Sequence, residues 1–236
     1  MNKLAALAFF ALAAAPAAAA PTLQRNYSVT DFDRVRVDGP FKVELATSVA
    51  PFARASGTVA ALDAVLIAVE GRTLVIKPNR SSWSGYPGQV PGPVAISVGT
   101  HDLSAAYVNG SGLLSVDRVK GLSFEITVQG AGSASVDEAA IDQLKLGISG
   151  SGTLRLAGTA GVMTALVRGT PSFDGSALRV KDARIGADGA PMIRALVSNS
   201  AKIDASGVAT VEIAGNPACT VTAKGSATVS GCRKSD

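Results

Sequence analysis

Acidic residues recur at a fixed spacing near the middle of the chain, and paired carboxylates carry out acid and base chemistry on polysaccharides. Asp117 is followed twenty residues later by Asp137, with Glu138 beside it. Stacked on one outer face, these carboxylates would suit a polysaccharide lyase or hydrolase, with a bound cation. Position 157 is alanine, however, so the row stops, and Arg118 lies where it neutralises the charges. A solvated row of charges is therefore favoured, and the carbohydrate-active enzyme is kept as the alternative.

Nucleophilic catalysis has less support. The sole histidine, His101, lies in GTHDLS with no repeated partner, and the serines recur at turns. A general base must come within hydrogen-bond reach of its nucleophile, and the sequence places none there. We read His101 as a surface residue and predict no catalytic residues, no metal site and no cofactor.

One long turn-rich loop, NRSSWSGYPGQVPGP (79–93), holds the only tryptophan. Trp83 and Tyr86 would stack on sugar rings or anchor a partner if the loop were exposed. The other interpretation is a lid in which both rings fold back onto the protein, and it is favoured because large aromatic side chains are usually buried. Trp83 and Tyr86 are the candidate ligand-binding residues.

The two cysteines, Cys219 and Cys232, lie thirteen residues apart near the C-terminal end. Exported proteins keep disulfides, and a metal pair would lack histidine partners here. The prediction is a disulfide that closes the last turns.

Glycine turns recur about every twenty residues, which is the spacing of a solenoid repeat. The sequence reads NGSG, QGAG and SGSG at successive turns, and the leading glycines are Gly110, Gly130, Gly150, Gly169 and Gly189. Glycine permits positive φ and close backbone approach, which a coil needs at a corner. Neither a phosphate-binding loop nor a calcium-binding repeat has this pattern.

The segments between the glycines alternate apolar and polar residues, as in LSFEITV (122–128). A two-residue period is typical of a β-strand with one buried face. A second short strand follows each turn, as at Leu114 and Val116. Two or three short strands per twenty residues predict an all-β parallel β-helix.

Charges that are twenty residues apart test this register, because stacked opposite charges stabilise it. Three such pairs are opposite in sign: Arg118 with Glu138, Glu125 with Lys145, and Arg168 with Asp188. Asp117 over Asp137 is the exception. Beyond Asp188 the turns restart at shorter intervals, which predicts smaller or irregular final coils.

The domain organisation predicted from these patterns is simple. Residues 1–19 have a lysine, a short apolar run and small residues before a cleavage site, so they are predicted to be a signal peptide. Residues 20–236 are predicted to form one β-solenoid domain, with irregular N-terminal strands over 20–100 that cap regular coils over 101–236. No transmembrane segment is expected in the mature chain.

Charge excludes one class of partner. Without Lys3, 21 Lys and Arg face 18 Asp and Glu, and no basic run is present. Nucleic acid is therefore not an expected partner.

The order of these segments resembles one family, the putative auto-transporter adhesin head domain, called the head GIN domain. The resemblance covers most of the mature chain and rests on FDRVRVDGPFKVELATS, GRTLVIKP, VNGSG, the SGSG turns and the closing AGNPACTVTAKGSATVSG. It implies a bacterial exported protein with a right-handed β-helix-like fold and no established catalytic residues. RGTPS (168–172) and DGAPM (188–192) place proline after the glycine, and with the cysteine pair they depart from the family pattern. These departures leave the coil shape after residue 168 open.

The expected function follows from the resemblance and from the missing catalytic constellation. We expect an exported, non-enzymatic cell-envelope protein of adhesin type that binds an envelope or surface protein or a glycan through its solenoid. It would reside in the periplasm, on the outer membrane surface or outside the cell.

Overall fold

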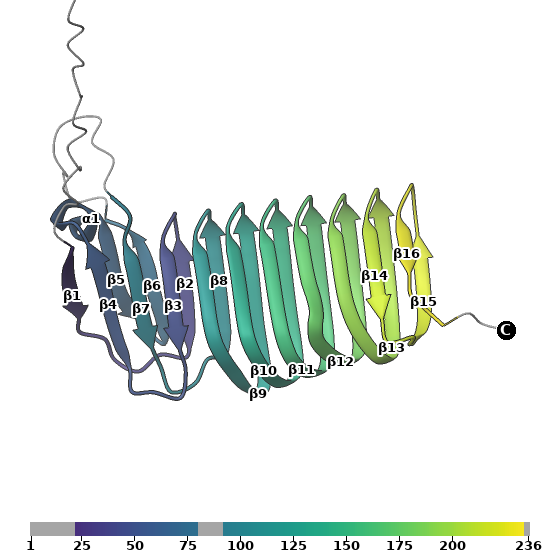
Figure 1. The fold of residues 1–236 in the computed structure, drawn as a ribbon, viewed down its shortest axis with the longest axis horizontal. Coiled ribbons are helices and arrows are strands. Elements are labelled where there is room, and N and C mark those ends of the chain that lie inside the picture. Colours follow the sequence, from purple (N-terminus) through teal and green to yellow (C-terminus); the bar gives the residue numbers. More distant parts are fainter. Residues whose placement is uncertain (1–21, 80–91, 234–236) are drawn as a thin grey trace, which may run out of the picture.

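Long parallel strands dominate the computed structural model, which describes residues 22–79 and 92–233. Five strands each form a nearly complete coil and stack side by side along one axis (Figure 1). They are β9 (Leu113–Gly130), β10 (Ser133–Gly150), β11 (Thr153–Gly169), β12 (Ser172–Gly189) and β13 (Met192–Gly207). The predicted parallel β-helix is confirmed. One detail differs, because the two short strands expected in each coil run together as one long bent strand.

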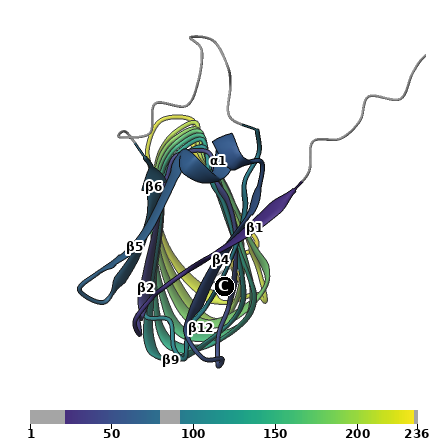
Figure 2. The same cartoon turned by 90° about the vertical axis from the view of Figure 1, so that its left-hand side faces the viewer.

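Each coil is flattened, so the solenoid has two broad sides joined by a glycine corner and a rounded bend (Figure 2). We call the side formed by the strand segments after the glycine corner face 1, for example 113–118 of β9. Face 2 is formed by the segments before the next corner, such as 123–130 of the same strand. On both faces, alternate residues point into a continuous core.

Rows of apolar side chains run through this core from coil to coil. One row on face 2 consists of residues paired in register and buried: Ile126, Leu146, Ala165, Ile185 and Ile203. Each large aliphatic side chain in such a row contributes about 1.5–3 kcal/mol by leaving water. The two-residue alternation in the sequence is therefore the direct cause of the stacking.

The glycine corners stack directly on one another. The leading glycines have φ between 75° and 106° from Gly110 to Gly225, a region that L side chains rarely adopt. The N–H of Ala131 donates to the carbonyl oxygen of Gly110 at 2.9 Å, and the same bond repeats at later corners. The corners thus continue the hydrogen-bond ladder as well as reversing the chain.

The proline corners keep this geometry. In RGTPS the N–H groups of Thr170 and Ser172 donate to the coil below, whereas position 171 between them is not a donor in the corner ladder. Proline, which has no N–H, therefore fits there without losing a bond. Pro191 occupies the equivalent position one coil later, and both prolines accept from the next coil through their carbonyl oxygens. After residue 168 the corners keep stacking, whereas the pairing of β12 with β13 shifts register between Gly175 and Arg179.

The coils also begin earlier than the sequence pattern indicated. Gly39 forms a corner that stacks below Gly110, joining β2 (Arg34–Asp38) to β3 (Lys42–Ala46). These strands pair in parallel with β8 (Ala105–Gly110) and β9 on one side. On the other side they pair with β6 (Thr73–Pro78) and β7 (Ala95–Gly99). Two coils therefore lie within the stretch predicted to be irregular.

The remaining N-terminal elements cap this end, as predicted. They are β1 (Leu23–Tyr27), β4 (Phe52–Gly57), α1 (Val59–Asp63) and β5 (Val65–Glu70). β1 pairs antiparallel with β4, β4 with β7 and β5 with β6, and α1 buries Ala61 and Leu62 beside β4 and β5. Thr58 caps α1 by accepting the N–H of Ala61.

The C-terminal coils are slightly smaller, as expected, and their corners still stack on one another. Corners at Gly189, Gly207 and Gly225 recur every eighteen residues. β14 (Thr210–Ala214) and β15 (Ala218–Ala223) stack on β13, and β16 (Thr228–Ser230) stacks on β14. Cys219 and Cys232 form the predicted disulfide, with Cα atoms 5.6 Å apart.

Candidate functional site

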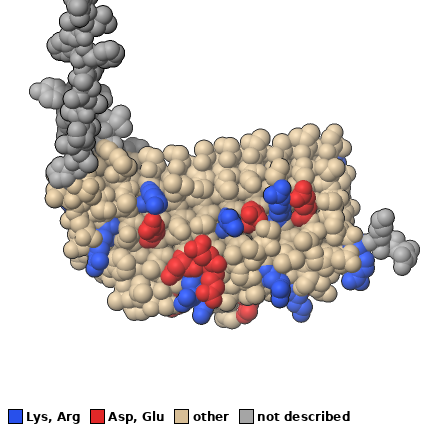
Figure 3. Space-filling model, in the orientation of Figure 1, with Lys and Arg blue, Asp and Glu red and all other residues tan. Residues whose placement is uncertain are grey.

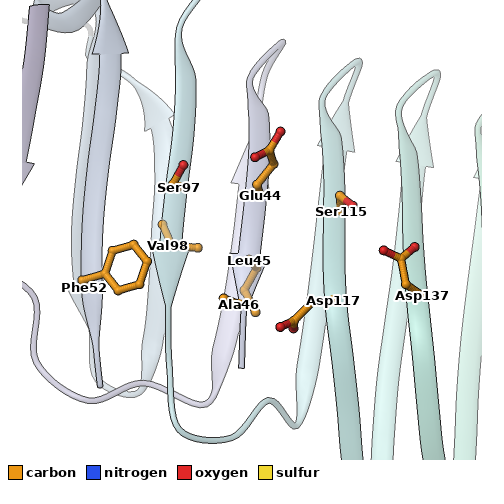
Figure 4. A pocket seen from close by; sticks show the side chains of 9 residues that line it. All are labelled: Glu44, Leu45, Ala46, Phe52, Ser97, Val98, Ser115, Asp117 and Asp137. Carbon is orange, nitrogen blue, oxygen red and sulfur yellow. The ribbon is translucent and has the colours of Figure 1, made fainter. Parts of the chain in front are cut away.

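Two shallow hollows meet on face 1, over the strands β7, β3, β9, β10 and β11. Their volumes are about 310 and 280 Å³, and Ser115 lines both. We call them together the face 1 groove. Figure 4 shows the larger hollow, with Phe52 at one end and carboxylates from neighbouring strands beside it. The polar, charged and aromatic side chains that line it include Lys42, Glu44, Phe52, Ser97, Ser115, Asp117, Ser135, Asp137 and Arg155.

The groove exists because small residues interrupt a row of long charged ones. The outward row that crosses face 1 places Glu44, Ser115, Ser135 and Arg155 in register on successive strands. The two serines leave space where neighbouring positions carry long side chains. The Ser135 hydroxyl donates to the Ser115 hydroxyl at 3.3 Å, so a pair of hydroxyl groups lies in a lining that is otherwise largely apolar.

The row beyond the groove compensates its own charge. From Arg155 it continues in register through Asp174, Arg194 and Glu212. Arg194 Nε lies 3.0 Å from Glu212 Oε2, and basic and acidic side chains alternate along this face in Figure 3. Stacked opposite charges stabilise neighbouring strands. This part of the row is therefore explained by folding alone.

Asp117 has a structural task at the rim of the groove. Its Oδ1 accepts the backbone N–H of Thr47 at 3.0 Å and that of Arg118 at 2.5 Å. The Thr47 hydroxyl lies 3.4 Å from the same oxygen, and this threonine is buried. Asp117 thus fastens the end of β3 to β9.

Glu138 is also engaged, whereas Asp137 is not. Arg118 Nε lies 3.0 Å from Glu138 Oε2, so this predicted charge pair closes into an ion pair. Asp137 is exposed and has no hydrogen bond or ion pair with any residue in the described part of the chain. Of the three acidic residues singled out in the sequence, only Asp137 offers a carboxylate with no structural role.

The other two predicted charge pairs also lie in register. Glu125 pairs with Lys145 across β9 and β10, and Arg168 pairs with Asp188 across β11 and β12. In both cases a hydroxyl approaches the carboxylate: Tyr107 lies 3.4 Å from Glu125, and Ser206 donates to Asp188 at 2.8 Å. The register inferred from charge is confirmed.

Tyr107 has a raised pKa, first because burial disfavours its charged form and then because of Glu125. The phenol therefore stays protonated and serves as a donor. It lies on face 2, away from the groove.

His101 lies apart from the groove. Its Nδ1 is 3.3 Å from Asp31 Oδ1, and both side chains are exposed to solvent. This placement matches the surface residue that we expected. Within residues 22–79 and 92–233, no group of three or more His, Cys, Asp or Glu side chains is placed to hold a metal ion.

Trp83 and Tyr86, the candidate ligand-binding residues, lie outside the described residues. β6 ends at Pro78, whose ring lies against Gly39 of the next corner.

Sequence reasoning missed the serines and the two basic residues of the groove. Ser115 and Ser135 are twenty residues apart, so the period alone would have stacked them. What could not be seen is that Glu44 continues the row, because 71 residues separate it from Ser115.

The coils, corners and cap together define an all-β solenoid protein. The chain belongs to the family described as "Putative auto-transporter adhesin, head GIN domain", whose model matches residues 31–217. No helix in the described ranges is long and apolar enough to cross a membrane. None of the curated proteins matches the chain.

Solved structures share the fold. A putative adhesin from Bacteroides fragilis superposes with a TM-score of 0.80 at 18% identity, covering 89% of this chain and 96% of that one. A putative lipid binding protein from Parabacteroides distasonis has a TM-score of 0.71 at 19% identity, with coverages of 88% and 95%. A putative adhesin from Parabacteroides merdae has a TM-score of 0.67 at 17% identity, with coverages of 88% and 95%.

Proposed function

We propose that this chain is an exported, non-enzymatic envelope protein of adhesin type that holds its partner in the face 1 groove. The observation that carries the proposal is the interruption of the outward row by Ser115 and Ser135, beside the unpaired carboxylate of Asp137. Elsewhere the row compensates its own charge, so folding does not require this gap. A hollow that presents a few polar groups on a fixed scaffold suits a binding site.

The scaffold suits binding because it is rigid before the partner arrives. Parallel strands hold successive groove residues about 4.7–4.9 Å apart, and the core fixes their direction. Little conformational entropy is then lost when a ligand is bound, which raises affinity for a given contact area.

The family and the similar structures support an adhesin. One similar structure bears the name of a lipid binding protein, but the hollows of the face 1 groove are shallow and open to solvent, whereas a lipid tail requires a cavity that encloses it. The enzyme alternative finds no observation in its favour, because Asp117 and Glu138 both have structural partners.

Export and a single domain are parts of the same proposal. The predicted signal peptide (1–19) lies outside the described residues, and the disulfide suits the periplasm, the outer membrane surface or the extracellular space. The described core residues form one connected cluster, which supports one domain over residues 20–236.

The test measures binding of the purified mature protein to envelope fractions and to intact cells. Ser135→Tyr fills the groove, and we expect it to lower binding at least about tenfold. Ser149→Tyr is the matched control, because Ser149 is an exposed serine on face 2 of the same strand. Equal binding by the two variants would contradict the proposal.

A further inference from the structure

We propose that the face 1 groove binds a saccharide chain that is uncharged or carries amines, and that it rejects acidic polysaccharides. This inference rests on the proposed function, because it names the ligand class of the same groove.

The groove is long in the direction of the solenoid axis. Its outward row starts at Ser97 on β7 and continues through β3, β9 and β10 to Arg155 on β11. Five neighbouring strands span about 19 Å from first to last. A single small molecule would leave most of this length empty, whereas an extended chain of sugar rings lies along it.

The groups along the groove match sugar hydroxyls. Ser97, Ser115 and Ser135 supply hydroxyls that both donate and accept, and the carboxylates of Asp117 and Asp137 accept only. Sugar hydroxyls likewise donate and accept, so each ring finds a partner on the floor and at the rim. An extended peptide would need backbone partners, and the strands of face 1 already pair with each other on both sides.

Charge decides which saccharides fit. Lys42 Nζ lies 3.0 Å from Glu44 Oε1, and Arg155 lies in register with Asp174. Lys42 is therefore paired and Arg155 has an acidic neighbour in Asp174, whereas no ion pair joins Asp137 to a basic side chain among the described residues. A uronate or a phosphate at the rim would be repelled, and an ammonium group would be attracted.

Phe52 closes one end of the larger hollow (Figure 4). Its ring lies against Gly99, and the Arg54 guanidinium is 5.3 Å from the ring centroid. An apolar ring edge at the end of a polar groove offers a surface for the C–H face of a terminal sugar. We expect the chain end, rather than its middle, to contact Phe52.

Calorimetry with three oligosaccharides of equal length tests the inference: N-acetylglucosamine, glucosamine and galacturonic acid oligomers. We expect the first two to bind, and the galacturonic acid oligomer to bind at least about tenfold more weakly. Asp137→Asn should weaken binding of the glucosamine oligomer and reduce the difference between the cationic and anionic probes. Asp204→Asn is the control, because it removes an exposed carboxylate from face 2.

The outcomes separate this inference from the proposed function. Binding of the galacturonic acid oligomer as tightly as the others would overturn the inference, and so would a failure to bind any oligosaccharide. If Ser135→Tyr still lowers envelope binding in that case, the proposed function stands without the sugar. Circular dichroism checks that each variant folds. Should Ser135→Tyr not fold, the smaller change Ser135→Asn, which also occupies the groove, replaces it.

Discussion

A Cβ atom on Gly169 would lie 2.5 Å from the carbonyl oxygen of Gly150, one coil below. That distance is well inside van der Waals contact, and the backbone of Gly169 also has a φ of 95°. The corner therefore needs glycine for two independent reasons: its conformation and its close approach to the neighbouring coil.

We expect Gly169→Ala to lower the free energy of unfolding by about 2–3 kcal/mol, because it adds both backbone strain and a steric clash. Urea unfolding of the two proteins measures the difference. Gly147→Ala is the control, since a Cβ there would meet only Thr127 at 3.5 Å, and its expected change is within about 0.5 kcal/mol. Equal effects of the two substitutions would contradict this account of the corners.

Removal of the disulfide should loosen the last coil. Cys219 and Cys232 close a loop with a sequence separation of 13 and pack against the end of the core. Loop closure of this length stabilises the folded state by about 2–3 kcal/mol. We expect reduction to speed amide exchange in β15 and β16 and to leave β9–β11 nearly unchanged, because coils contact mainly their neighbours. Faster exchange throughout the solenoid would show that the end coil controls global stability.

Reversing one member of the Arg118–Glu138 ion pair tests the register. Arg118→Glu places two carboxylates opposite each other on adjacent strands, and we expect a loss of up to about 1 kcal/mol because the pair is exposed. The double variant Arg118→Glu with Glu138→Arg should recover most of this loss. A double-mutant cycle by thermal unfolding measures the recovery. Additive losses would mean that the two side chains do not interact in solution.

The free energy of unfolding should depend on pH through two aspartates, Asp174 and Asp182. Hydrogen bonds from the Ser176 hydroxyl and backbone hold the pKa of Asp174 below its ordinary 3.8. The Ser200 hydroxyl, followed by Asn199, lowers that of Asp182 from the same value. A depressed pKa in the folded state stabilises the protein above the unfolded pKa, and this contribution is lost as pH falls through the folded value.

The corresponding variant is Ser200→Ala, which removes the principal cause of the Asp182 shift. We expect it to be less stable than the parent near pH 6, and the difference between the two proteins to shrink as pH falls below 3.8, because the carboxylate becomes protonated. Thermal unfolding across this range is the measurement. Ser149→Ala serves as the control. A difference that stays constant at every pH would rule out the carboxylate as its origin.

The repeats of this fold could be predicted because their causes are local. Gly110, Gly130 and Gly150 mark corners, and the alternation between them marks strands, so the parallel β-helix follows from the sequence. Leu122 shows the limit of pattern reading: it extends the alternation of LSFEITV, yet its side chain is 78% exposed, because the chain is still in the bend at that point.

The N-terminal coils could not be predicted in the same way. Gly39 is a corner like the others, but 71 residues separate it from Gly110, so no period connects them. The residues of the face 1 groove come from both sides of this gap. Glu44 precedes it and Ser115 follows it, and only the pairing of β3 with β9 brings them together.

The order of the first coils along the axis differs from their order in the sequence, and this affects how the chain folds. The coil built from β2 and β3 is made first, yet it lies between the coil of β6 and β7 and the coil of β8 and β9. During synthesis, neither of its neighbours exists until dozens of further residues have emerged. β2 and β3 are stabilised only by contacts with strands that are distant in sequence, and such contacts form slowly. From β9 onward each coil joins the one just before it. A slow nucleation near residues 34–116, followed by rapid growth towards the C-terminus, is the folding route that this topology imposes.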